Sequence, residues 1–110
     1  MEYTKEETLK VINQTIKNCS KMLDKFNPNK PQYSLLVNRI KALNVAKGLI
    51  EENNNISKIE IERALKSIES IIMKLKKAQE KYDINTKQYK KFLPLLNAMY
   101  VAKYHILQFI

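Results

Sequence analysis

The segment ISKIEIERALKSIESIIMKL, residues 56–75, decides the fold. Ser57 and Glu60 have the spacing of a capping box, in which a hydroxyl and a carboxylate close the first turn of a helix. Ile56 and Ile61 flank this box at the two positions of a hydrophobic staple. The apolar residues that follow are spaced by three or four, which predicts a helix from about residue 58 to residue 82. This apolar stripe consists of Ile61, Leu65, Ile68, Ile72 and Leu75.

A second helix is expected before this segment, beginning at Pro31 or Ser34 and ending near Glu52. Its apolar positions again recur every three or four residues, as on one face of a helix. They are Leu36, Ile40, Leu43, Ala46 and Ile50. The asparagine run 53–55 is the turn that joins this helix to the helix after it.

The first helix begins with another capping box, formed by Thr4 and Glu7. Its stripe is Leu9, Ile12, Ile16, Cys19, Leu23 and Phe26. Pro28 disfavours helical geometry in the residue before it, so the helix is expected to end near Asn27.

The last helix begins near Thr86 and contains a proline, Pro94, eight residues further on. A proline inside a helix removes one hydrogen bond and clashes with the preceding turn, at a cost of about 3 kcal/mol. We therefore expect either a kink between Lys90 and Pro94, or a short helix followed by a new one that starts at Leu93 or Pro94.

These four helices predict an all-α fold, and residues 1–110 are expected to form a single domain. The chain has one glycine and three prolines, which fits long helices with short connections. Short connections between helices of similar length make neighbours antiparallel. The sequence therefore predicts an antiparallel up-and-down four-helix bundle.

The chain is strongly basic, with 20 Lys and Arg against 11 Asp and Glu, a net charge of +9. Such a balance has two explanations: an anionic partner, or an A- and T-rich genome, because Lys, Ile and Asn codons are rich in these bases. No apolar run reaches the roughly 18 residues of a membrane-spanning helix. Met1–Glu7 also lacks the pattern of a secretory signal or transit peptide. A cytoplasmic protein is expected.

Antiparallel order would place the first and third connections at one end of the bundle, together with many lysines. These are Lys21, Lys25, Lys30, Lys74, Lys76, Lys77, Lys81, Lys87, Lys90 and Lys91. Lys87, Lys90 and Lys91 stand at a helix N-terminus, where the helix dipole disfavours cations. Tyr33, Tyr82 and Tyr89 are expected at the same end, and lysines interleaved with aromatic rings can bind single-stranded nucleic acid. The alternative is a solvated lysine-rich end.

Arg39 falls on the apolar face of its helix, where an unpaired charge is costly. It is expected to extend to the rim, to pair with an acid such as Asp24, or to bind an anion or a partner carboxylate. The candidate anion-binding set is therefore Arg39, Lys74, Lys77, Lys81, Lys87, Lys90 and Lys91. Gly48 either permits a close approach to its helix or begins to fray that helix.

The last helix carries more apolar surface than one core requires, because its apolar residues cover well over half of its circumference. Either this helix is the most buried one, or a second face of it meets another molecule, of which a symmetric homodimer is the favoured form. The candidate interface residues are Leu95, Met99, Ala102, Tyr104, Ile106 and Phe109.

The sequence shows no pattern of catalytic chemistry. It has one His and one Cys, no phosphate-binding glycine loop, and no spacing of metal ligands. Cys19 is expected to be buried and to act as a small apolar residue. His105 is expected to be exposed to solvent. We therefore expect that the protein is not an enzyme and that it binds no cofactor and no metal. The expected function is interaction with another protein; the alternatives are binding of nucleic acid or another polyanion, and a role as the accessory subunit of an enzyme.

In length, basic balance and expected bundle, the chain resembles the small cytoplasmic immunity proteins that protect bacteriocin producers. This resemblance implies a helical bundle that binds a protein partner and has no catalytic activity; no motif carries a family residue onto this chain. Residues 33–43, YSLLVNRIKAL, are also similar to a segment of small bacterial proteins, and that similarity implies no chemistry.

Overall fold

The computed structural model describes residues 4–53 and 55–110, and within these ranges the chain forms helices and connections without a strand. In order, the helices are α1 (Lys5–Leu23), α2 (Pro31–Ile50), α3 (Lys58–Gln79), α4 (Lys87–Lys91) and α5 (Leu93–Leu107). The predicted all-α four-helix bundle is confirmed, and the last predicted helix is divided into α4 and α5. Residues 1–3, part of the segment in which no signal or transit peptide is expected, and Asn54 of the expected turn lie outside the described residues.

The two predicted N-terminal caps are present. The Thr4 hydroxyl accepts a hydrogen bond from the amide of Glu7 at 3.0 Å, and the Ser57 hydroxyl accepts one from Glu60 at 3.3 Å. The Ser57 hydroxyl also donates to Glu60 Oε1 at 2.9 Å. These bonds satisfy helical amides that have no partner within the helix, so each helix begins where its sequence predicts.

Helix α2 begins at Pro31, the earlier of the two expected starts, and ends in a left-handed turn at Glu52. The amide of Glu52 donates to Leu49 O at 3.1 Å, and the amide of Asn53 donates to Gly48 O at 2.8 Å. This pair of bonds is the Schellman arrangement, which satisfies the last carbonyls of a helix.

The helix is interrupted at Phe92, between α4 and α5, and Pro94 lies in the first turn of α5. The first turn of a helix contains amides without intrahelical partners, so a proline there loses no hydrogen bond. The expected irregularity near Pro94 is confirmed, because the last helix bends at Phe92 and α5 begins at Leu93.

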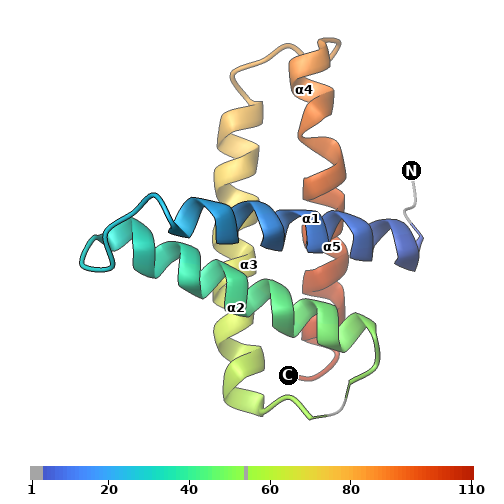
Figure 1. The fold of residues 1–110 in the computed structure, drawn as a ribbon. Helices are drawn as coiled ribbons and strands as arrows, with labels where there is room; N and C mark the ends of the chain where they lie inside the picture. Colours follow the sequence, from blue (N-terminus) through green and yellow to red (C-terminus); the bar gives the residue numbers. More distant parts are fainter. Residues whose placement is uncertain (1–3, 54) are drawn as a thin grey trace.

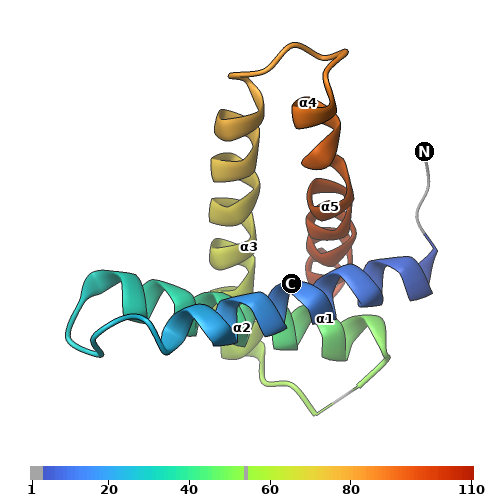
Figure 2. The ribbon, with the colours of Figure 1, turned by 45° about the horizontal axis from the view of Figure 1, so that its top comes forward.

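The helices form two antiparallel hairpins that cross each other. Figure 1 shows the α1–α2 hairpin lying across the pair formed by α3 and α5, and Figure 2 shows the same crossing from another direction. The first connection, residues 24–30, and the third, residues 80–86, therefore lie at different ends of the molecule. The expectation that Lys21, Lys25 and Lys30 join the lysines of the third connection is wrong, because it assumed that all four helices share one axis.

One hydrophobic core lies where the hairpins cross. Fully buried residues from all four long helices contribute to it: Ile12, Leu43, Ile68, Met99 and Ile106. The short helix α4 contributes no buried residue. Burying one such side chain stabilises the fold by roughly 1.5–3 kcal/mol, so the core, and not α4, supplies most of the stability.

Candidate interaction surfaces

The apolar surface of α5 divides between the core and the solvent. Met99, Ala102 and Ile106 are 0% exposed, and Leu95 is half-buried against the core. Helix α5 contacts α1, α2 and α3, so this side of the helix is enclosed by its own chain. The prediction of a partner interface at Met99, Ala102 and Ile106 is therefore wrong.

The opposite side of α5 carries an exposed stripe, which we call the α5 outer face. It consists of Leu93, Tyr100, Tyr104 and Leu107, and the exposed Phe109 and Ile110 follow it. The spacing of seven, four and three residues puts the four side chains on one face of a helix. Tyr104 is 63% exposed, and its ring meets the ring of His105 edge-to-face at 5.7 Å. Of the predicted interface residues, Tyr104 and Phe109 are the two that are well exposed. The prediction missed Leu93, Tyr100 and Leu107.

Charged and apolar groups of α3 lie beside this face. Lys103 Nζ on α5 is 3.3 Å from Glu69 Oε2 on α3. Met73, one turn after Glu69 on the same side of α3, is 65% exposed. An exposed apolar side chain of α3 therefore lies one helical turn from the ion pair that joins α3 to α5.

The end formed by α3 and α4, which we call the basic end, carries six of the predicted anion-binding residues. Lys74, Lys77, Lys81, Lys87, Lys90 and Lys91 are all exposed there, and no carboxylate of the described residues forms a salt bridge with any of them. Figure 1 shows this end projecting beyond the α1–α2 hairpin.

Hydrogen bonds and ring contacts fix the shape of the basic end. Buried Gln79 donates from Nε2 to Tyr89 O at 3.1 Å, and the rings of Tyr82 and Phe92 lie 6.2 Å apart. In the connection, the amide of Asn85 donates to the Asp83 side chain at 3.1 Å. These contacts hold the lysines of two helices on one ordered hairpin.

Arg39 does not belong to the basic end. It lies half-buried on α2, close enough to Cys19 of α1 for its charge to act on the thiol. Burial raises the pKa of the Cys19 thiol above its usual value, and the positive charge of Arg39 partly opposes this rise. No carboxylate among the described residues pairs with Arg39, Asp24 included. Two of the expected alternatives therefore stay open, extension of the side chain to the rim and binding of an anion or a partner carboxylate.

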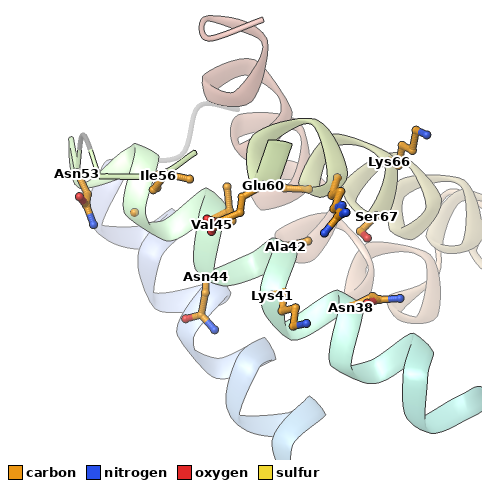
Figure 3. Close-up of a pocket in the computed structure, with 13 residues that line it drawn as sticks. Asn38, Lys41, Ala42, Asn44, Val45, Asn53, Ile56, Glu60, Lys66 and Ser67 are labelled. Carbon is orange, nitrogen blue, oxygen red and sulfur yellow. The ribbon is translucent and has the colours of Figure 1, made fainter. Parts of the chain in front are cut away.

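The sequence did not predict the groove between α2 and α3, which has a volume of about 800 Å³ (Figure 3). Its α2 side is formed by Asn38, Lys41, Ala42, Asn44, Val45 and Gly48. Its other side is formed by Asn53, Ile56, Glu60, Arg63, Ala64, Lys66 and Ser67. The small side chains Ala42 and Ala64 leave the space open, but whether two alanines face each other depends on how the helices cross, which no sequence spacing reveals.

Three further observations concern chemistry and relatives. Among the described residues, no three His, Cys, Asp or Glu side chains lie together as a metal site would require. None of the helices in the described ranges has the length and apolarity needed to cross a membrane. Comparisons with protein families, with curated proteins and with solved structures gave no match to this chain.

Proposed function

We propose that this protein is a non-enzymatic interaction protein that associates through the α5 outer face, in the first place with a second copy of itself. The observation that carries the proposal is the exposed stripe of Leu93, Tyr100, Tyr104 and Leu107 on the helix that also fills the core. Tyrosine is enriched in protein interfaces because its ring is largely apolar while its hydroxyl keeps a polar partner.

The shape of this face suits a two-fold dimer. Such a dimer places the same patch of both copies in contact, and with the two-fold axis perpendicular to α5 the two copies of this helix would run antiparallel. The stripe from Leu93 to Leu107 is roughly 21 Å long at 1.5 Å per residue, with its two tyrosines near the middle. Lys103 and Glu69 at its border supply charges of both signs, which can pair across the two-fold axis.

Sedimentation velocity over a range of protein concentrations tests the proposal. We expect the protein to dimerise and the variants Tyr104→Glu and Leu107→Glu to sediment as monomers, because a buried unpaired charge is very costly. The control is Ile84→Glu, which changes a similarly exposed apolar residue in the third connection and should leave the dimer intact. A protein that stays monomeric at millimolar concentration would remove the homodimer from the proposal.

Bacteriocin immunity is the specific biological role that we propose for a bundle that binds a protein partner. Its support is the likeness in length, charge and helical architecture, so expression in a bacteriocin-sensitive strain is the direct test. Increased resistance that is lost in the Tyr104→Glu variant would support the role, and unchanged sensitivity would end it.

Polyanion binding at the basic end is a second candidate function, favoured by the exposed lysines that lack acidic partners on an ordered hairpin. The affinity of the protein for single-stranded nucleic acid should fall steeply between about 50 and 200 mM salt. The double variant Lys90→Gln, Lys91→Gln should reduce that salt dependence. Unmeasurable binding at low salt would reject this candidate.

A further inference from the structure

The groove between α2 and α3 combines an aliphatic floor with a polar rim. Ala42, Val45 and Ala64 are buried at its base, so small apolar atoms form the floor. Another depression, by contrast, is lined by residues of α1 alone. Specific ligand sites are typically concave and combine apolar surface with placed polar groups. This groove has both, and eight of its thirteen lining residues are polar or charged, which favours a polar ligand.

The rim of the groove is positively charged. Lys41 on α2 and Arg63 and Lys66 on α3 are exposed cations that line it. Glu60 is the one carboxylate in the lining, and its Oε1 already accepts a hydrogen bond from the Ser57 hydroxyl at 2.9 Å. Within the described ranges none of the three cations forms a salt bridge. Arginine in particular binds carboxylates with two parallel hydrogen bonds, so the rim is suited to an acidic ligand.

Two asparagines add unused amide groups of opposite kind. Asn44 donates from Nδ2 to Ile40 O at 3.0 Å, which leaves its side-chain oxygen as an acceptor. Asn53 accepts the Asn55 amide at 2.9 Å through Oδ1, which leaves its NH₂ group as a donor. One acceptor and one donor match the N–H and C=O groups of a peptide backbone.

We propose that this groove binds a short acidic peptide segment of a partner protein, with an aliphatic side chain on the floor and carboxylates at Lys41 and Arg63. From Asn38 to Gly48 the groove follows α2 for roughly 15 Å, the length of about four to five extended residues. No aromatic ring belongs to the lining, so nothing there stacks on a nucleobase. The site is separate from the α5 outer face and does not depend on the function proposed above.

Titration of the ¹⁵N-labelled protein with the acetylated pentapeptide Glu-Leu-Glu-Leu-Glu tests the proposal by NMR. We expect amide shifts concentrated in residues 38–48 and 60–67, and at least tenfold weaker binding of the analogue in which glutamine replaces each glutamate. The double variant Lys41→Gln, Arg63→Gln should also weaken binding at least tenfold. Both side chains are exposed, so this variant should fold like the unaltered protein. The dispersion of its amide spectrum checks that it is folded.

The double variant Lys90→Gln, Lys91→Gln is the matched control, since it removes the same charge from α4 and should bind the peptide like the unaltered protein. The proposal is overturned if millimolar peptide shifts no groove amide, or if the glutamine analogue binds equally well. It is also overturned if the shifts map to the basic end and disappear in the control. Tyr104→Glu should leave the titration unchanged, which separates this test from that of the α5 outer face.

Discussion

Thr8 has a buried hydroxyl that lacks a hydrogen-bond partner. The residue is fully buried in α1, and its Oγ1 has no partner among the described residues. A buried polar group left without a partner costs about 1–3 kcal/mol. We expect Thr8→Val, which keeps the shape of the side chain, to raise the free energy of unfolding by about 1 kcal/mol in urea denaturation.

Thr15 provides the control for this prediction on the same helix. Its hydroxyl donates to Val11 O at 2.8 Å, so Thr15→Val removes a hydrogen bond that is actually made. That variant should be no more stable than the unaltered protein. Equal stabilisation by both substitutions would show that valine, and not the unpaired hydroxyl, is responsible.

The buried Cys19 thiol is expected to lower the stability of the fold as the pH becomes alkaline. Because burial raises the pKa of its thiol in the folded state, the unfolded chain loses this proton first as the pH rises. Below the unfolded pKa of about 8.5 the thiol is protonated in both states and the free energy of unfolding is at its full value. Above that pH the free energy of unfolding declines, by at most about 1.4 kcal/mol per pH unit. Urea denaturation between pH 7 and pH 10 should show a steeper loss for the unaltered protein than for Cys19→Ala, and parallel profiles would contradict this.

At the scale of the element, the end of α2 is strained at one residue. Glu52 has a φ of 63°, a left-handed conformation that costs about 1–2 kcal/mol in residues other than glycine. We expect Glu52→Gly to stabilise the protein by about 1 kcal/mol, measured as the shift of the urea midpoint.

The neighbouring Glu51→Gly is the matched control, because Glu51 has a φ of −82° and gains nothing from glycine. It should leave the stability unchanged or lower it slightly. A stabilisation by Glu51→Gly as large as that by Glu52→Gly would refute the strain at position 52.

The helices were the most predictable part of the fold, because their signals are local. Ser57 with Glu60, Thr4 with Glu7, and Pro94 each act within one or two turns, so their spacing in the sequence was enough. Gly48 shows where local reasoning stops. A Cβ at this position would lie 2.7 Å from Ile56 Cδ1, so the glycine makes room for the connection that returns over α2, a contact between two elements.

At the scale of the whole molecule, the net charge of +9 should make stability depend on salt. The described residues form one ion pair, between Lys103 and Glu69, while the lysines of the basic end repel one another. Raising NaCl from 10 to 150 mM shortens the screening length from about 30 Å to about 8 Å. We therefore expect the melting temperature to rise by a few degrees.

A variant with Lys77→Glu and Lys90→Glu should have a higher melting temperature at 10 mM NaCl and a flatter dependence on salt. Both side chains are exposed, so the substitutions alter charge without disturbing the core. A melting temperature that falls with added salt in the unaltered protein would show that attraction, not repulsion, dominates its surface.

The crossing of the two hairpins was the least predictable feature, and both candidate surfaces depended on it. Short connections determine that neighbours are antiparallel, but the angle between hairpins depends on how side-chain ridges fit between helices. Alanines at the crossing, such as Ala46 and Ala102, are fully buried and permit close contact. The sequence pattern therefore identified the surplus apolar surface of α5 but misassigned Met99, Ala102 and Ile106, and it gave no sign of the groove.

Helix α4 contains no buried residue, and it is joined to α3 by the Gln79–Tyr89 hydrogen bond and the Tyr82–Phe92 ring contact. With so little buried surface, the outer part of this hairpin is expected to be less stable than the crossing. Its amides should exchange with solvent hydrogen far sooner than those around Ile68. A chain built in this way can tolerate insertions and altered residues at its outermost turn without losing its cooperative centre.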